Sequence, residues 1–450
     1  MPPSIDHIFK AYDIRGLSPA ELNPSLARRI GASFVDYLHA RNIAIGRDMR
    51  DTSPELRDAF IEGARSRGAH VVDIGMVSTD MLYFAVANGS LDGGAMITAS
   101  HNPKEYNGIK LVRQGAVALS GDAGIQEVRQ GALGPEPAPF AGAQGTLTSQ
   151  DVSEAFVQHC LSFIDVTRLR PLKLVLDAGN GMGGPAAEKV FAKLPFNRTD
   201  LFFTPDGNFP NHPADPLVEE NRRDIIAAVK EQGADLGIAW DGDADRCFFI
   251  DDTGEFIPGD FVTALLGTMF SNREPGATIV YDVRASRAVA DSVRAAGGNP
   301  VMHRVGHAFM KVKMRELNAV YGGEVSAHYY FRDNWFADNG MIPALLLLEL
   351  VCASGRKLSE LLAPYRAKYF ISGEINSKVA DVPAALARLA DRFKEGRVSR
   401  LDGLSVDFDD WHFNVRGSNT EPLLRLNLEA FSQADMERRR DEVVAIIRGQ

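Results

Sequence analysis

Short apolar runs alternate with amphipathic segments along most of the chain, and the alternation begins close to the N-terminus. A run of β-branched and other apolar residues that is too short for a helix predicts a buried strand, whereas apolar residues recurring every three or four positions predict a helix. The first such region predicts strands and intervening helices at 42–48, 53–68, 70–75, 78–87 and 94–97. This order is typical of an α/β fold.

The same order of strand and helix recurs twice. The second copy predicts strands at 173–177, 200–203 and 236–240, with a helix at 219–232. The third predicts strands at 278–282 and 300–304, with a helix at 285–296. Strands separated by helices form mainly parallel sheets covered on both faces, and their carboxyl ends carry the binding loops.

The pattern changes near residue 372 to a helix, several strands and a closing helix, which predicts a smaller α+β domain. We therefore expect an α/β fold: three similar, mixed, mostly parallel α/β units plus a smaller C-terminal α+β domain around a central cleft. A stretch rich in Pro, Gly and Ala at 131–145 reads as an exposed boundary. The expected domains are 1–145, 146–252, 253–368 and 369–450.

The net charge, the apolar runs and the cysteines exclude several classes of partner and location. The 450 residues carry a formal net charge of −10, which argues against nucleic acid or an acidic membrane as the main partner. The longest apolar run, 341–348, is too short to span a bilayer, and three scattered cysteines fit a reducing compartment. We expect a cytoplasmic protein and, because no heptad pattern stands out, a monomer.

A serine follows one of the predicted strands in the sequence TASHNP at 98–103. Pro103 ends the strand, so Ser100 lies at a carboxyl end, where α/β sheets bind ligands. A hydroxyl there suits nucleophilic phosphoryl or acyl chemistry, with His101 and Lys110 nearby to handle protons or charge. The alternative is a serine in an ordinary turn.

Three carboxylates stand at alternate positions in DGDADR, 241–246. In an extended segment Asp241, Asp243 and Asp245 would share one face, and Gly242 would let the backbone turn so that they converge. Like charges this close require a hard cation, which predicts a magnesium-type site. The alternatives are a solvated acidic turn and an EF-hand, whose sixth position should be Gly but is Arg246 here.

Two further loops suit a phosphorylated sugar. RGSNTEP at 416–422 offers a guanidinium, hydroxyls and a permissive glycine for phosphate, the alternative being a polar turn. In GEVSAH, 323–328, Glu324 and Ser326 would share one face of an extended segment and suit paired hydroxyls. By itself the pair is also common at strand ends.

A glycine-rich loop at 179–184 matches the dinucleotide fingerprint, with Asp200 or Asp206 as a ribose ligand. A dinucleotide-dependent oxidoreductase is therefore an alternative. The fingerprint does not account for the serine, aspartate and arginine loops, which favours the phosphoryl-transfer interpretation.

Six ordered motifs together resemble the α-D-phosphohexomutase family, most closely its phosphomannomutase/phosphoglucomutase branch. They cover essentially the whole chain: KAYDIRG at 10–16, TASHNP at 98–103, NGIK at 107–110, DGDADR at 241–246, GEVSAH at 323–328 and RGSNTEP at 416–422. The resemblance implies four domains around a cleft, carrying in order the phosphoserine, the metal, the sugar-recognition loop and the phosphate loop.

The resemblance also implies the site residues. Ser100 would be the phosphoserine, and Mg²⁺ would bind a phosphoserine oxygen with Asp241, Asp243 and Asp245. Catalytic groups around Ser100 would be Arg15, His101, Lys110 and His328, with the general acid or base left open among Arg15, Lys110 and His328. Substrate would contact Tyr12, Arg246, Arg284, Gly306, His307, Lys311, Glu324, Ser326, His328, Arg416, Ser418, Asn419 and Thr420.

The implied reaction interconverts mannose or glucose 1-phosphate and 6-phosphate through a 1,6-bisphosphate, with glucose 1,6-bisphosphate as activator. Two departures from the family pattern, Val305 for a threonine and Arg284 for a lysine, bear on substrate preference. We expect the C-terminal domain to hinge near 366–372. The alternatives are a metal-dependent phosphatase that uses the same serine and a non-catalytic sugar-phosphate-binding protein.

Overall fold

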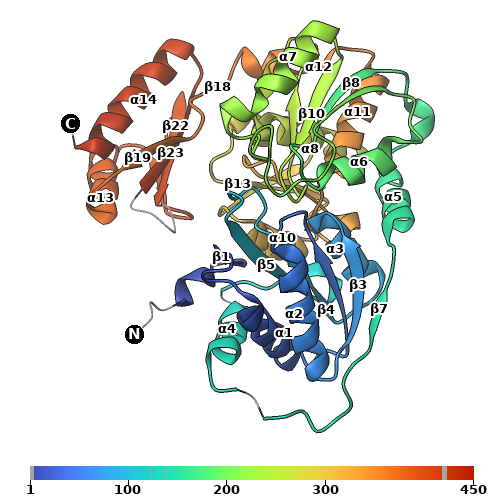
Figure 1. The fold of residues 1–450 in the computed structure, drawn as a ribbon. Coiled ribbons are helices and arrows are strands. Elements are labelled where there is room, and N and C mark those ends of the chain that lie inside the picture. Colours follow the sequence, from blue (N-terminus) through green and yellow to red (C-terminus); the bar gives the residue numbers. More distant parts are fainter. Residues whose placement is uncertain (1–4, 122, 137, 418–422, 450) are drawn as a thin grey trace. The chain divides into compact units, whose positions relative to one another are not determined.

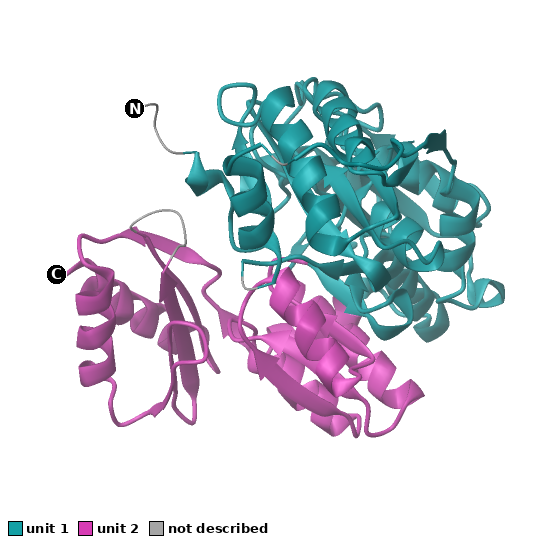
Figure 2. Ribbon diagram, turned by 90° about the horizontal axis from the view of Figure 1, so that it is seen from below, with its two compact units in different colours: residues 1–257, 328–358 teal, residues 258–327, 359–450 magenta. Residues whose placement is uncertain are grey.

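The computed structural model describes residues 5–121, 123–136, 138–417 and 423–449. The chain forms two compact units that are not continuous in sequence (Figure 2). Unit 1 comprises residues 1–257 and 328–358, and unit 2 comprises 258–327 and 359–450. The segment 328–358 therefore returns to unit 1 after the chain has begun unit 2.

The first sheet of unit 1 has the order β1-β5-β4-β2-β3-β7, with β6 paired to β5. The central strands are parallel, and β5 runs antiparallel to both β4 and β1. The strands are β1 Ile14–Leu17, β2 Asn42–Arg47, β3 His70–Met76, β4 Gly93–Ile97, β5 Tyr106–Arg113, β6 Val117–Ala118 and β7 Leu147–Ser149. The helices are α1 Pro24–Leu38, α2 Ser53–Ser66, α3 Thr79–Asn88 and α4 Ile125–Leu133 (Figure 1).

Helices α1 and α2 show how local sequence builds this layer. The Asn23 side chain accepts a hydrogen bond from the Leu26 N–H, and Pro24 begins the helix with a suitable φ. Gly31 and Gly63 lie where the two helices meet, and a Cβ on Gly63 would overlap the Arg28 carbonyl oxygen. Both glycines are therefore needed for the close approach of the helices.

A second sheet in unit 1 has the order β12-β11-β10-β8-β9, with β10 parallel to β8 and antiparallel to β11. Its strands are β8 Lys173–Asp177, β9 Asn197–Leu201, β10 Leu236–Trp240, β11 Cys247–Ile250 and β12 Phe256–Ile257. The helices here are α5 Ser153–Leu161, α6 Gly183–Phe191 and α7 Arg223–Gln232. Sequence and structure differ at two elements: the strand predicted at 200–203 ends at Leu201 because Phe202 has φ +54°, and the helix predicted at 219–232 opens with a separate 3₁₀ turn, 219–222.

The returning segment of unit 1 contains β16 Tyr329–Phe331, β17 Ala337–Asp338 and α11 Ile342–Ser354. Ten residues of α11, mostly leucine and other apolar types, are buried. The indole N–H of Trp240 donates to the Gly340 carbonyl at 2.8 Å, which ties the segment to the end of β10. The apolar run 341–348 is thus a core helix, and none of the described helices is long and apolar enough to cross a membrane.

Unit 2 contains three parallel strands in the order β14-β13-β15, followed by an antiparallel sheet in the order β18-β23-β22-β21-β20, with β19 paired to β23. The strands are β13 Thr278–Asp282, β14 Asn299–His303, β15 Tyr321–Gly323, β18 Phe370–Ile371, β19 Ile375–Lys378, β20 Arg397–Ser399, β21 Leu404–Asp407, β22 Trp411–Gly417 and β23 Leu423–Ala430. The helices are α8 Gly259–Arg273, α9 Arg287–Ala295, α10 His307–Leu317, α12 Leu358–Arg366, α13 Val382–Arg392 and α14 Gln433–Arg448.

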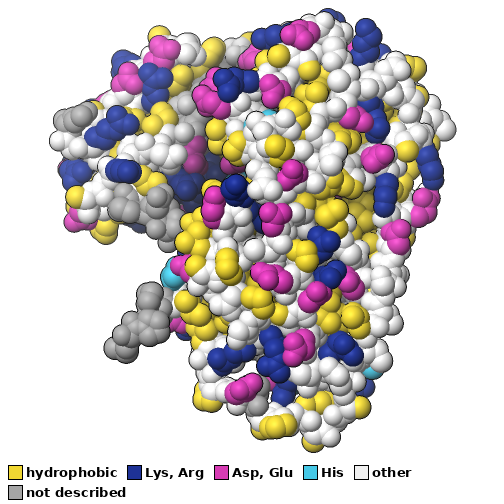
Figure 3. All heavy atoms as spheres, viewed as in Figure 1, with side chains coloured by type: hydrophobic (Ala, Val, Ile, Leu, Met, Phe, Trp, Pro, Cys, Tyr) yellow, Lys and Arg dark blue, Asp and Glu magenta, His cyan; other side chains and the backbone are white. Residues whose placement is uncertain are grey.

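The prediction of mixed, mostly parallel α/β layers followed by an α+β domain is confirmed. The exact domain boundaries stay a prediction, because each compact unit combines separate parts of the chain. On the face drawn in Figure 3, Lys and Arg side chains lie among Asp and Glu side chains. That face therefore carries charges of both signs.

Candidate active site

Ser100 lies in the loop that follows β4, in the left-handed region with φ +50°. Its Oγ donates a hydrogen bond to Asp241 Oδ2 at 2.7 Å and lies 3.2 Å from His101 Nδ1. The side chain is almost fully buried. A strained, buried serine that is bonded to a carboxylate suits a reacting group better than an ordinary turn residue.

Arg50 holds this serine loop in place. Its guanidinium donates to the carbonyl oxygens of Ser100, Asn102, Pro103 and Tyr106 at 2.6–2.9 Å. The side chain is 1% exposed, and its Nε lies 3.2 Å from Asp48 Oδ2. Sequence analysis missed Arg50, although its place just after the end of β2 was the available signal.

The three predicted carboxylates converge on the turn between β10 and β11. Oxygens of Asp241, Asp243 and Asp245 lie within 4.8 Å of one another, and all three residues are buried. Gly242 lies in this turn, but the residue with a left-handed φ, +60°, is Ala244. Gly242 is required for a different reason, because a Cβ there would overlap the Ser100 carbonyl oxygen.

Two cations offset part of the negative charge of the three carboxylates. Arg246 Nε lies 3.0 Å from Asp241 Oδ2, and Lys110 Nζ lies 2.6 Å from Asp243 Oδ2 and 2.5 Å from Asp245 Oδ2. Burial raises the pKa of Asp241 to about 7, and the neighbouring carboxylates add to the effect. Burial alone would lower the pKa of Lys110, but Asp243 and Asp245 hold it well above its usual value.

The donor set fits a hard divalent cation. Among the described residues, Asp243 Oδ1 and Asp245 Oδ1 are buried and have no hydrogen-bond partner. A buried carboxylate oxygen without a partner is costly, and carboxylate oxygens are the ligands that Mg²⁺ prefers. The convergence of three buried carboxylates, two of which have an oxygen without a partner, is therefore explained by a metal site rather than by a solvated acidic turn.

Thr79, the first residue of α3, contacts the turn that carries Asp241, Asp243 and Asp245, which we call the metal turn. Its Oγ1 donates to Asp243 Oδ2 at 2.6 Å, and its N–H donates to the Asp243 carbonyl at 2.9 Å. Sequence analysis missed this residue, because only the fold brings positions 79 and 243 together.

Arg15 lies on β1 and is joined to the serine loop. Its guanidinium donates to Asp13 Oδ2 at 2.5 and 2.9 Å and to Asn102 Oδ1 at 2.6 Å. Tyr12 is half-buried just before this strand. Desolvation holds the pKa of His101 well below its usual value, and Arg246 and Arg15 lower it further.

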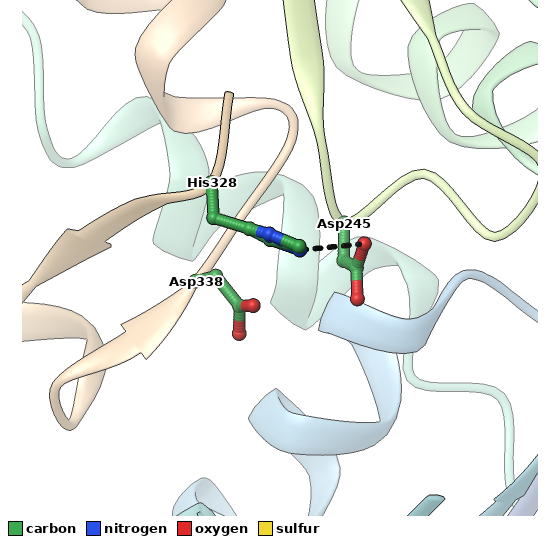
Figure 4. A group of neighbouring side chains, drawn as sticks. All are labelled: Asp245, His328 and Asp338. Atoms are coloured by element: carbon green, nitrogen blue, oxygen red, sulfur yellow. Dashed lines mark ion pairs between the residues drawn. The ribbon is translucent and has the colours of Figure 1, made fainter. Parts of the chain in front are cut away.

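His328 reaches the metal turn from the segment that precedes β16. Its Nε2 lies 3.8 Å from Asp245 Oδ1, and Asp338 approaches from β17 (Figure 4). One potential ligand atom from each of these three residues lies within 4.8 Å of the others. His328 and Lys110 thus both contact the Asp245 carboxylate in unit 1.

Unit 2 gathers most of the predicted sugar-binding residues. The Glu324 carboxylate is buried and accepts a hydrogen bond from the Gly306 N–H at 2.8 Å. His307 and Lys311 lie one turn apart at the start of α10. Glu324 and Ser326 lie on a turn, so the extended segment predicted for them was wrong. Glu324 is buried and Ser326 is half-buried.

Arg284 is held by Asp282 beside the predicted sugar-binding loop. It makes two hydrogen bonds to Asp282, at 3.0 and 2.9 Å, and Asp282 also accepts from the Val325 N–H. Arg416 lies near the end of β22, and burial lowers its pKa, with Arg284 contributing. Ser418, Asn419 and Thr420 lie outside the described residues.

The glycine-rich loop at 179–184 supports the metal turn. The Met182 N–H donates to the Gly242 carbonyl at 2.9 Å, and a Cβ on Gly181 would lie 2.7 Å from the same oxygen. These contacts explain the glycines by close packing. The dinucleotide fingerprint is therefore accounted for without a dinucleotide.

Four family models match the chain in order. They describe the phosphoglucomutase/phosphomannomutase alpha/beta/alpha domains I, II and III at residues 6–133, 154–254 and 258–369, and the C-terminal domain at 374–446. A phosphomannomutase of Salmonella montevideo is 46% identical, with 98% of each chain covered. The phosphohexose mutases of Xanthomonas campestris are also 46% identical, over 98% of this chain and 99% of theirs.

A solved structure agrees with the sequence matches. A phosphoglucomutase/phosphomannomutase family protein from Burkholderia thailandensis superposes with a TM-score of 0.89 at 36% identity, covering 98% of this chain and 97% of that one. Fold and site together define a phosphohexomutase, an enzyme of the isomerase class that transfers phosphoryl groups within sugar phosphates. The chain belongs to the phosphoglucomutase/phosphomannomutase family.

Proposed function

We propose that the enzyme interconverts hexose 1-phosphates and hexose 6-phosphates through a phosphorylated Ser100, acting on mannose and glucose phosphates. The observation that supports this most directly is the 2.7 Å hydrogen bond from Ser100 Oγ to Asp241, beside two further buried carboxylates. A nucleophilic hydroxyl adjoining a cation site is the arrangement that phosphoryl transfer requires.

Mg²⁺ would be held by Asp241, Asp243, Asp245 and an oxygen of the phosphorylated Ser100. When bound, the ion neutralises negative charge on the phosphoryl group being transferred. Arg50 keeps the Ser100 backbone in place, because its guanidinium binds carbonyls on both sides of the loop. Thr79 orients the Asp243 carboxylate.

In the first half-reaction the bond between phosphorus and Ser100 Oγ breaks, and a new bond forms to the free hydroxyl of the hexose phosphate. A general base takes the proton of that hydroxyl and a general acid protonates the departing Ser100 Oγ, and the candidates for these two roles are Arg15, Lys110 and His328. In the second half-reaction the 1,6-bisphosphate has turned around, and its other phosphoryl group returns to Ser100. At the end of the cycle Ser100 is phosphorylated again, and the sugar carries one phosphate, as it did at the start.

Glu324 and Ser326 would bind sugar hydroxyls that mannose and glucose share, and this supports dual specificity. Arg416, with Ser418, Asn419 and Thr420, would bind the phosphate that is not being transferred. The sugar site would be completed by Gly306, His307 and Lys311. The Arg284 guanidinium would place a positive charge beside it. Activation by glucose 1,6-bisphosphate, a monomeric state and a cytoplasmic location are also part of this proposal.

Phosphorus NMR tests the proposal directly. The full-length enzyme receives Mg²⁺, a trace of glucose 1,6-bisphosphate, and mannose 1-phosphate and glucose 1-phosphate together. Both substrates should convert to their 6-phosphates, and Ser100→Ala should convert neither. Accumulation of inorganic phosphate would instead identify a phosphatase, and binding without turnover by both proteins would identify a sugar-phosphate-binding protein.

A further inference from the structure

Glu374 lies between two arginines in unit 2. Its Oε1 is 3.2 Å from Arg425 Nη1, and its Oε2 is 3.6 Å from Arg284 Nη1. The residue immediately precedes β19, whereas Arg425 is on β23 and Arg284 follows β13. One carboxylate therefore joins guanidinium groups from two sheets.

The strand register explains why an anion is needed here. Arg416 and Arg425 are direct cross-strand partners on β22 and β23. Like charges directly opposite each other in a sheet are destabilising, and Arg284 adds a third positive charge near Arg416. Within the described part of the chain, the Nε atoms of Arg416 and Arg425 are buried and have no hydrogen-bond partner. The arginines thus retain donor capacity that Glu374 does not use.

A carboxylate and a phosphate compete for the same guanidinium donors, because both present oxygens in the fork geometry that arginine binds. Glu374 is 26% exposed, so it can leave the arginines without moving out of a packed core. Among the described residues whose charge acts on Arg416, the second carboxylate is Asp402, but it already accepts a hydrogen bond from the Val305 N–H at 3.0 Å. Glu374 is therefore the carboxylate that an incoming phosphate would replace.

We propose that Glu374 is an internal competitor that sets the affinity of the arginine cluster for the substrate phosphate. The inference rests on the proposed function, in which Arg416 binds the phosphate that is not transferred. A bisphosphate that has to turn around must release this phosphate during each cycle. Glu374 gives the arginines a partner at that moment, so it weakens binding and speeds release.

The test measures binding of glucose 6-phosphate by calorimetry to full-length enzyme carrying Ser100→Ala, which prevents turnover. Adding Glu374→Gln should tighten binding about threefold to tenfold, the range expected when a partly exposed ion pair no longer competes. Glu374→Asp should also tighten binding, because the shorter side chain keeps the charge but cannot span both arginines. Unchanged or weaker binding in Glu374→Gln would overturn the proposal.

Glu442 on α14 provides a matched control. It is 25% exposed and also contacts two arginines, Arg392 and Arg439, in the same antiparallel domain. Glu442→Gln should leave binding unchanged, whereas equal tightening in both amide variants would reduce the effect to net charge and contradict the proposal. If Glu374→Asp bound glucose 6-phosphate with wild-type affinity, net charge alone would explain the effect of Glu374→Gln. That result would also contradict the proposal.

Two further measurements separate this inference from the proposed function. In turnover assays with intact Ser100, Glu374→Gln should lower KM and kcat together, which a purely structural role would not do. Arg416→Ala should weaken glucose 6-phosphate binding at least tenfold. If it does and Glu374→Gln has no effect, only the role of Glu374 fails. If Arg416→Ala binds normally, the proposed phosphate site is wrong and the role of Glu374 fails with it.

Discussion

The backbone of Gly242 lies against the carbonyl oxygen of Ser100, so closely that a single added methyl group would overlap it. The proposed nucleophile and the proposed metal turn come from different sheets of unit 1, and this contact sets their separation. Phosphoryl transfer depends on such positioning, because small displacements of reacting groups cost large factors in rate.

Gly242→Ala should therefore lower kcat by about 100-fold, since the displaced Ser100 loop no longer meets the carboxylates correctly. The measurement is steady-state kinetics with either hexose 1-phosphate. Gly355→Ala is the control, because Gly355 has φ +66° and open space around it. It should lose about 1 kcal/mol of stability and keep its activity. Equal activity losses in both variants would show that the Gly242 contact has no special role.

Thr79→Val should raise the Mg²⁺ concentration for half-maximal activity by about 10-fold to 100-fold, because Asp243 loses the hydroxyl that orients it. Thr79→Ser should restore the wild-type requirement, since it keeps the donor. Titration of Mg²⁺ into metal-depleted enzyme, followed by activity, checks this. If the valine variant had wild-type Mg²⁺ dependence, Thr79 would have only a structural role.

Stability should depend on pH through Glu429, which is buried on β23 near Asp260, Arg287 and His412. Burial raises the pKa of Glu429 to about 8. The folded protein then keeps a proton that the unfolded chain loses near pH 4.5, so stability falls as pH rises toward 8. Burial lowers the pKa of His412 to about 4, which costs stability only as pH falls below about 6.5. Burial raises the pKa of Asp260 to about 6.

Between pH 6.5 and 8.5 Glu429 should therefore dominate among these groups. The Tm of the wild-type protein should fall across this range, and Glu429→Gln should flatten the fall, which corresponds to a loss of at most about 2 kcal/mol between pH 6.5 and 8.5. Thermal unfolding at three pH values measures the slope. Glu442→Gln should keep the wild-type slope. A wild-type slope in Glu429→Gln would mean that this carboxyl is already ionised at pH 6.5.

Arg287 anchors the antiparallel sheet of unit 2 to α9. Its guanidinium contacts the Asp407 carboxylate and the carbonyls of Phe408, Asp409 and Trp411. Arg287→Lys keeps the charge but cannot span these acceptors, so about 2–4 kcal/mol should be lost locally. Hydrogen exchange at 404–417 and proteolysis at the predicted hinge, 366–372, should both become faster. Unchanged exchange and cleavage would exclude Arg287 as the anchor.

The repeated order of strands and helices could be predicted because buried strands and amphipathic helices leave different periodicities in sequence. Ser100 and Asp241 could be found for a related reason, since both follow predicted strands. The ends of strands could not be predicted where a single backbone angle decides them. Phe202 ends a strand through a left-handed φ that an apolar side chain does not announce.

Residues that act across the fold could not be predicted. Thr79 and Asp243 are 164 positions apart, and Arg50 binds carbonyl groups, which have no sequence signature. The reason for Gly242 was also hidden, because the clash that it avoids involves a loop from another sheet. Nothing in the sequence distinguishes Glu374 from other surface carboxylates. Its role follows from the register of β22 and β23, which places Arg416 opposite Arg425.

The late return of 328–358 to unit 1 has a consequence during synthesis. A growing chain that ends before residue 328 contains Ser100 and all three aspartates but lacks α11 and Gly340, which bonds Trp240 behind the metal turn. Unit 1 therefore cannot complete its core on the ribosome until most of the chain has been made, so the half-built protein exposes apolar surface that chaperones recognise. Ser100 is translated early, yet its surroundings are among the last to be finished.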